Sequence, residues 1–286
     1  MDTAWTRLLA TLLDLLVVIF AVTSMLSVGF GNPVRRIVEP LRNWRWMAQA
    51  MLANFVLVPL LALAVVRLAP LDQPQEAGLI LVGMSAGAPF VVKLLEAARG
   101  DVARGASLLV VLLPVTVVYA PVAVPQVLPG AEVRTVALAV PLILTMLLPF
   151  AVGLMVRERW RKLAKWLVSP ARQLSTVALA LIVPATVLAD VPAIMKMFRD
   201  GAVFPALFVI VAAFAVGYLL GGADRNDREA FGFGTSQRNI AAATVMATQS
   251  FDDPSTVAMV IVTSLAGFFV LFPAAWLFRR RRSRAR

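Results

Sequence analysis

The stretch AGLILVGMSAGAPFVVKLLEA, residues 77–97, is a run of apolar residues with Gly87, Pro89 and Lys93 placed inside it. The run is long enough to span a bilayer, whose hydrocarbon core takes about 20 apolar residues of helix. Glycine and proline weaken the hydrogen-bond ladder of a helix. Pro89 suits the first residue of a new half-helix, because its missing N–H costs nothing there. The stretch therefore predicts a transmembrane helix that is interrupted at 87–89.

A second apolar run, at residues 229–249, has the same character. It contains GFGTSQRN at 232–239, where two glycines precede a row of polar groups, and we expect an interruption at 232–236. The predicted helix-breaking residues are Gly87, Pro89, Gly232 and Gly234. Two interrupted hydrophobic segments in corresponding positions of two halves are the best sequence indicator of a transporter's binding site. The candidate substrate-binding residues are therefore those at the interruptions: Ala88, Pro89, Lys93, Thr235, Ser236, Gln237, Arg238 and Asn239.

The rest of the chain is also strongly apolar. Of its 286 residues 60% are hydrophobic and 15% are charged, and the mean hydropathy is +0.84. A soluble domain of this size cannot hide so much apolar surface, because its outer faces must be polar. The pattern predicts an all-α, polytopic membrane protein with about nine transmembrane helices. The predicted spans are 8–30, 46–66, 77–97, 106–127, 135–156, 173–192, 203–222, 229–249 and 256–278.

The basic residues predict the orientation of the chain. Most of its 27 Lys and Arg residues fall in one set of alternate loops, including 157–172, and in the C-terminal stretch. Cytoplasmic loops carry the excess of basic residues, so we expect the C-terminus in the cytoplasm and the N-terminus outside. The expected location is the inner (plasma) membrane of a cell. This placement also explains the net charge of +11, so we infer the lipid bilayer as a partner and no nucleic acid.

The order of the spans divides the chain into two halves. Residues 1–127 would form the first, with four helices and the interruption at 87–89. Residues 128–278 would form the second, with five helices and the interruption at 232–236. Residues 279–286, rich in arginine, would form a basic cytoplasmic tail. The sequences of the two halves show no repeat at the level of residues. The correspondence between the halves therefore rests on the order of their spans.

The chain contains no cysteine and no histidine. That removes disulfides, thiolate chemistry and the commonest metal and general-base ligands. An intramembrane enzyme would have to rely on Ser, Lys or carboxylates, and no spacing here suggests such a site. We therefore expect no enzyme activity, no catalytic residue and no metal site. We also expect no cofactor, with the use of sodium left open.

Two basic residues, Lys93 and Arg238, fall inside predicted spans. A charge near mid-membrane costs at least about 2.5 kcal/mol on insertion scales, and it is normally paired or faces a cavity. Lys93 could pair with Glu96, three residues on, and Arg238 could bond to carbonyls of the interrupted helices. Either residue could instead meet a ligand. Glu96, and Asp14 in the first span, are candidates for ion coupling.

At these two motifs the chain resembles the bile acid:sodium symporter family, including its bacterial members. The resemblance rests on SVGFG at 27–31, GAPFVVKLLEAARGD at 87–101 and GTSQRNIAAA at 234–243. It implies a fold of ten helices in two inverted five-helix repeats, with two discontinuous crossing helices and a division into core and panel domains. Nine-helix members lack the first helix, which matches four helices plus five and the outside N-terminus predicted here.

The resemblance also places the family's sodium ligands on this sequence. Sodium-coupled members have an acidic residue at the second broken helix, followed by a Gln-Asn pair. Matching Asn239 to that Asn puts Arg238 at the Gln position and Gly234 at the acidic one. The Ser-Asn ligands of the first half fall at Val91 and Val92. A hard cation needs several oxygen ligands, and these replacements remove side-chain oxygens.

We therefore hypothesise that Lys93 and Arg238 stand in electrostatically for the two sodium ions. They would hold the crossing half-helices together and attract an anionic substrate, with half-helix N-termini adding to the attraction. The favoured function is a secondary transporter of small organic anions that works by alternating access. The alternatives are a proton-coupled carrier, an exporter-type carrier and, from another class, a channel. The oligomeric state is left open between monomer and homodimer.

Overall fold

The computed structural model describes residues 3–189 and 191–284, and these form helices joined by turns and short loops, with no strand among them. The expected all-α, polytopic fold is confirmed. The elements are α1 (Thr3–Gly31), α2 (Val34–Val38), η1 (Pro40–Arg42), α3 (Trp44–Leu52), η2 (Ala53–Leu57), α4 (Val58–Leu68), α5 (Gln73–Met84), α6 (Phe90–Ala97), α7 (Val102–Val127), α8 (Thr135–Leu142), η3 (Ile143–Leu147), α9 (Leu148–Arg159), α10 (Arg161–Ala189), α11 (Val191–Arg199), α12 (Val203–Leu220), α13 (Arg225–Ser236), α14 (Ile240–Ser250) and α15 (Pro254–Arg284).

Seven helical stretches of the described residues are long and apolar enough to cross a membrane. Two of them are made of three consecutive elements each, at 44–68 and 135–159. The predicted spans 77–97 and 229–249 are absent from these seven because each is divided into two shorter helices. The count of nine spans therefore stays a prediction.

One expectation about boundaries is wrong. The predicted basic loop at 157–172 does not exist, because α9 ends at Arg159 and α10 begins at Arg161. Basic side chains on an exposed face do not stop a helix, so they are a poor guide to its start. The predicted basic tail at 279–286 is helical as far as the structure describes it, since α15 continues to Arg284. Its Arg282 donates to Asn226 and Glu229, each at 2.7 Å, which ties the end of this helix to α13.

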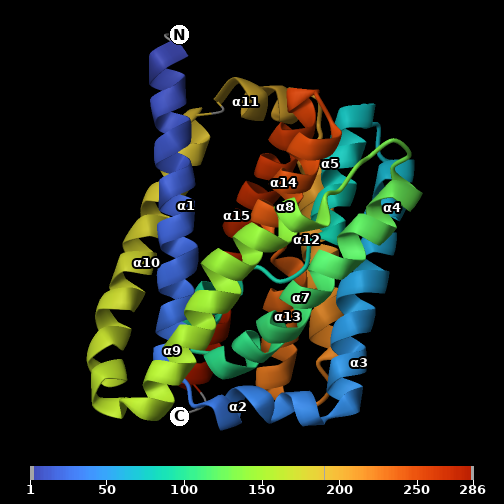
Figure 1. Ribbon diagram of the computed structural model, residues 1–286. Coiled ribbons are helices and arrows are strands. Elements are labelled where there is room, and N and C mark those ends of the chain that lie inside the picture. The colour runs from blue at the N-terminus through green and yellow to red at the C-terminus, as the bar shows by residue number, and fades with distance from the viewer. Residues whose placement is uncertain (1–2, 190, 285–286) are drawn as a thin grey trace.

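The connections between helices gather at two opposite ends of the bundle, with α2 and the α9–α10 turn at the bottom of Figure 1 and α11 at the top. At the top end Gln75 donates to Asp200 and Ser250 donates to the carbonyl of Glu132. At the bottom end the contacts are ion pairs, such as Arg36 with Asp101. Alternate loops therefore lie at opposite ends, as span order predicts, while the end that faces the cytoplasm stays a prediction.

Helices α1, α9 and α10 pack against one another along one side of the bundle, as Figure 1 shows for α1 and α10. Helix α1 lies unusually close to α9 at Gly29 and Gly153. A Cβ atom built on Gly29 would lie 2.7 Å from the Gly153 Cα atom, so any larger residue would push the two backbones apart. We call α1, α9 and α10 the outer group, and the remaining long helices the inner group.

An aromatic cluster seals part of the seam between the two groups. Phe20 of the outer group stacks on Phe90, the first residue of α6, with ring centroids 4.2 Å apart. Phe90 also contacts Phe268 of α15, at 4.8 Å. All three side chains are buried. The interruption before Phe90 therefore lies directly behind a contact with α1.

Candidate functional site

The first interrupted helix is broken at residues 85–89, between α5 and α6. Gly87 has a positive φ of 83°, a conformation that L side chains rarely adopt. Pro89 lies directly before Phe90, the first residue of α6, and its carbonyl accepts the first-turn N–H of Val92 at 3.2 Å. Gly87, Ala88 and Pro89 thus all lie inside the break, with Ala88 buried.

The second break lies at 237–239, a few residues after the predicted position. Helix α13 runs through Gly232 and Gly234 without interruption to Ser236. The two glycines serve close packing: a Cβ on Gly232 would lie 3.0 Å from the Phe214 ring, and one on Gly234 would lie 2.7 Å from Leu108 Cδ1. The assignment of these glycines as helix breakers is therefore wrong.

The two breaks touch each other through Asn239. Its backbone N–H donates to the carbonyl of Ser85 at 2.9 Å, and its Nδ2 donates to the carbonyl of Gly87 at 3.0 Å. Its Oδ1 accepts the N–H of Ala242 at 3.1 Å, which caps the start of α14. One buried side chain thus begins α14 and joins the unwound backbones of both interrupted helices.

Arg238 lies where the two breaks meet, a place that we call the crossing, and its side chain is buried. Its guanidinium donates to four backbone carbonyls and one side-chain amide. The shortest bonds go to Gly83 O at 2.7 Å and Asn54 Oδ1 at 2.8 Å. The carbonyls of Val82, Thr235 and Asn54 accept at 3.3 Å each. None of the acceptors is a carboxylate, so no anionic side chain offsets the guanidinium charge here.

The acceptors lie at helix ends that carry partial negative charge. Val82 and Gly83 belong to the last turn of α5, and Thr235 to the last turn of α13. Carbonyls at the C-terminus of a helix lack intrahelical partners and form the negative end of its dipole. In discontinuous transporter helices such ends coordinate a cation. The guanidinium of Arg238 occupies that electrostatic position in this protein.

The carbonyl of Asn54 is free to accept because of a proline. Residues 53–57 form a π-helical turn, in which the N–H of Val58 bonds to Ala53 O. The next donor in this pattern would be Pro59, which has no N–H. Asn54 O is left without a helical partner and instead receives Arg238. Asn54 is not among the predicted site residues, although a lone amide in an apolar run five residues before a proline is a usable signal.

The other predicted residues of the second break have separate roles. Thr235 Oγ1 accepts from Asn54 Nδ2 at 3.3 Å, and Ser236 Oγ returns to the carbonyl of Gly232 at 2.7 Å. Gln237 is buried, yet its Oε1 has no hydrogen-bond partner and faces α15 near Gly267. A buried polar atom without a partner costs about 1–3 kcal/mol. Gln237 is therefore the group at the crossing with unused capacity to bind a ligand or water.

Lys93 does not lie at the crossing. Its Nζ donates to Glu96 at 3.1 Å and, across to α10, to Arg172 O at 3.3 Å and Thr176 Oγ1 at 3.1 Å. Glu96 in turn pairs with Arg172 at 2.9 Å. The idea that Lys93 joins the two crossing helices is therefore wrong, because its side chain points from α6 to the outer group. The ion pair with Glu96, weighed as an alternative, is present.

Asp14 lies apart from the other candidates. Its side chain is exposed on α1, between the exposed residues Leu12 and Leu15. The structure does not bring it to the crossing or to Glu96.

Three of the positions matched to the family's sodium ligands, Val91, Val92 and Gly234, carry no side-chain oxygen. Val91 and Val92 are buried in α6, and Val91 Cγ2 would lie 3.8 Å from a Cβ on Gly234. Leu108 fills the remaining side. Across residues 3–189 and 191–284 no group of acidic residues could hold a metal ion. Val91, Leu108 and Gly234 therefore form an apolar contact between α6, α7 and α13.

A polar cleft of about 230 Å³ opens between the two groups of helices at the bottom end of the bundle. Ser27, Gly31 and Asn32 line it from α1 and its end, and Glu96 and Arg172 line it from α6 and α10. A narrower apolar space of about 10 Å³ continues between α1, α7 and η3, with Val28 common to both. That space is also lined by Met146, whose sulfur lies 3.9 Å from Asn239 Nδ2. The cleft thus leads along the seam toward the crossing.

Comparison with known proteins agrees with this geometry. The family described as "SBF-like CPA transporter family" matches residues 11–266 of the chain. A relative in rice (Oryza sativa subsp. japonica), described as "Probable sodium/metabolite cotransporter BASS2, chloroplastic", is 26% identical over 198 residues. The match covers 68% of this chain and 47% of the relative, so the chain spans about half the length of that protein.

Proposed function

We propose that this chain, which belongs to the SBF-like CPA transporter family, moves small organic anions across a membrane by alternating access and without sodium. The family makes it a multi-pass membrane transporter rather than an enzyme. The rice relative is described as a probable sodium/metabolite cotransporter. We propose three further properties: that the substrates are organic anions, that transport works by alternating access, and that it does not require sodium. We also propose the inner membrane as its location, with the N-terminus outside, and no bound cofactor.

The observation that carries the proposal is the cage around Arg238. Four carbonyls and one amide fix the guanidinium in place. It therefore supplies a permanent positive charge at helix C-termini, where other discontinuous transporter helices bind a cation. Arginine stays charged at any physiological pH. The apolar contact among Val91, Gly234 and Leu108 removes the oxygen ligands that a sodium ion needs.

The same crossing favours an anionic substrate. Helices α6 and α14 both begin there, and the N-terminus of a helix attracts negative charge. Gln237 adds an unused polar group, and no carboxylate contacts Arg238 to repel an anion. Carboxylates and sulfonates are the chemical classes that this arrangement fits.

Alternating access is supported by the seam between the outer and inner groups. It is a polar cleft at one end, closes to a water-sized apolar space, and is sealed by Phe20 against Phe90. Movement of the inner group against α1 and α10 would open this contact and expose the crossing. Lys93 is placed to resist that movement, because it binds α10 from α6.

The proposal predicts that uptake of the substrate does not require sodium. Purified protein in proteoliposomes would be given a panel of labelled organic acids under an inward sodium gradient or a matched potassium gradient. We expect equal initial rates within about twofold, since charge at the crossing is supplied by Arg238. A third arm with an inward proton gradient tests the proton-coupled alternative, which the position of Glu96 in the cleft favours. Strict dependence on sodium would overturn the proposal.

The proposal also predicts that Lys93 holds the seam closed. Because the chain has no cysteine, single cysteines can report accessibility. Leu109→Cys probes the apolar part of the seam, and Leu108→Cys probes the packed interior beside Gly234. Adding Lys93→Met should raise the maleimide labelling rate at position 109 by about tenfold or more, as loss of a bond to a charged group is worth roughly 1.5–3 kcal/mol.

The labelling rate at position 108 is the control for that experiment. It should stay unchanged, because Leu108 packs inside the inner group and not at the seam. Equal increases at both positions would mean that Lys93→Met unfolds the protein. If the labelling rate at position 109 does not increase, Lys93 does not hold the seam closed.

A further inference from the structure

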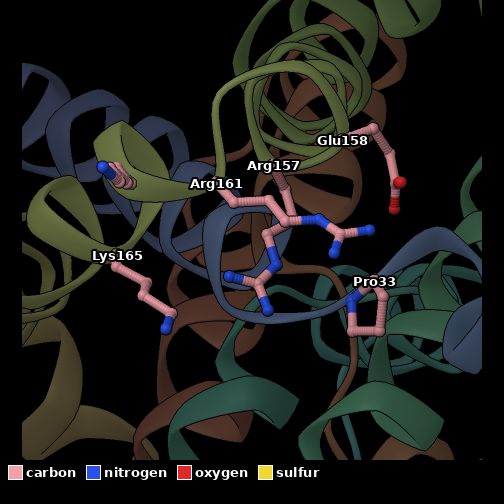
Figure 2. A pocket seen from close by; sticks show the side chains of 6 residues that line it. Pro33, Arg157, Glu158, Arg161 and Lys165 are labelled. Atoms are coloured by element: carbon pink, nitrogen blue, oxygen red, sulfur yellow. The ribbon is translucent and has the colours of Figure 1, made fainter.

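A basic cavity lies at the turn between α9 and α10, at the bottom end of the bundle. It has a volume of about 360 Å³ and is lined by Arg157, Arg161, Lys162, Lys165, Glu158 and Pro33. Figure 2 shows the side chains of Arg157 and Arg161 extending into the space between this turn and Pro33. Four cations and one carboxylate therefore share one cavity.

Several basic residues at this end are held in ion pairs, whereas the four cavity cations are not. Arg36 pairs with Asp101, Arg172 pairs with Glu96 and Arg282 pairs with Glu229. In the described part of the chain, the side chains of the four cavity cations make no ion pair or hydrogen bond. Glu158 is occupied elsewhere, because its Oε1 accepts the N–H of Val34 at 3.3 Å. Unpaired like charges repel, so the cavity favours a bound anion.

The surroundings of the cavity are apolar and exposed. Trp160 is 53% exposed at the turn itself, and Trp166 is 72% exposed on the first turns of α10. Met155 and Leu163 are also exposed beside them. Tryptophan is enriched where a protein meets the boundary between lipid and water. These exposed tryptophans favour a position of the cavity near the level where phospholipid headgroups meet the protein.

We infer that this cavity binds the headgroup of an anionic phospholipid. The phosphate would lie among Arg157, Arg161 and Lys165, and the acyl chains would cover Trp166 and Leu163. In the predicted orientation this end faces the cytoplasm, and basic pockets between transmembrane helices on that side bind headgroups of this kind. A soluble phosphate would satisfy the cations but would leave the apolar rim uncovered. Binding would fix the ends of α9 and α10 at the membrane surface, and it does not depend on the transported substrate.

The inference is tested with purified protein in neutral detergent micelles. Phosphatidylglycerol or phosphatidylcholine is titrated at equal mole fraction, inorganic phosphate is added in a third arm, and the melting temperature is recorded. We expect phosphatidylglycerol to raise the melting temperature saturably and the other two additions to leave it unchanged. The triple variant Arg157→Gln, Arg161→Gln, Lys165→Gln should need at least about tenfold more phosphatidylglycerol, since each basic residue near a surface contributes roughly a fivefold gain in affinity.

A matched variant with the same loss of charge is the control. Arg42, Arg279 and Arg281 are exposed at the same end of the bundle and lie outside the cavity. Replacing these three by Gln should leave the phosphatidylglycerol titration unchanged. If the triple cavity variant is not stable, Arg161→Gln with Lys165→Gln tests the same point, because both side chains are exposed.

Three outcomes would overturn the inference. Equal weakening in the cavity variant and the control variant would mean that charge acts diffusely. An equal effect of phosphatidylcholine would mean that the headgroup charge is irrelevant. A saturable shift by inorganic phosphate alone would assign the cavity to a soluble anion.

Discussion

Replacing Arg238 by methionine is expected to reduce the initial rate of anion uptake at least about 100-fold and to destabilise the protein by roughly 3–5 kcal/mol. Methionine fills a similar length of space but donates no hydrogen bond. The variant would leave the carbonyl of Gly83 and the amide oxygen of Asn54 without their shortest partner. It would also leave the negative ends of α5 and α13 facing each other without a cation.

Two further variants separate charge from geometry. Arg238→Lys keeps the charge but has three donors on one atom, so it cannot reach acceptors on both α5 and the π-helical turn at 53–57. We expect it to retain partial transport. Arg42→Met removes an exposed arginine and should change neither uptake nor stability.

The measurements are uptake into proteoliposomes and thermal melting in detergent, with each variant compared in sodium and in potassium. If sodium restores uptake by Arg238→Met but has no effect on uptake by the wild type, the guanidinium of Arg238 takes the place of a sodium ion. If Arg238→Met has the same uptake rate and the same stability as the wild type, Arg238 has no part in the mechanism. Normal stability with lost uptake would make it a substrate ligand rather than a structural cation.

Much of the fold follows from the sequence because the bilayer restricts the choices. Long apolar runs can only be helices there, and alternate loops must lie at opposite ends, as the contacts of Gln75 and Arg36 bear out. The first break was correctly located, since Gly87 and Pro89 each constrain the backbone at their own position. The short helix α11 was missed, because it lies between two runs and is too short to span.

The site was only partly predictable because its parts come from distant segments. Gly232 and Gly234 were interpreted as breakers, but they accommodate Phe214 and Leu108, neighbours that only the packed structure supplies. Asn54 is far from Arg238 in sequence, and its role depends on a π-helical turn set by Pro59. The direction in which a lysine points is equally a tertiary property. The side chain of Lys93 therefore contacts α10, although its position in the sequence predicted that it would lie at the crossing.

Gly87→Ala is expected to destabilise the protein by about 2–5 kcal/mol and to lower uptake at least about tenfold. The left-handed conformation costs an L residue roughly 1–2 kcal/mol, and Gly87 has φ +83°. Overpacking adds about 1–3 kcal/mol, because a Cβ there would lie 3.1 Å from the backbone nitrogen and Cγ of Leu113. The carbonyl of Gly87 also accepts from Asn239, so a shift of this backbone would disturb the crossing itself.

Gly130 provides a control with the same strain and no crowding. Its φ is +88°, and no atom lies within 4 Å of a Cβ built on it. Gly130→Ala should therefore show the conformational cost alone, about 1–2 kcal/mol, with normal uptake. The difference between the two variants in free energy of unfolding isolates the contact with Leu113, and the difference in uptake isolates the crossing. Equal losses in both variants would mean that the left-handed residue at the break is only a strained turn, and that the contact between the interrupted helices tolerates displacement.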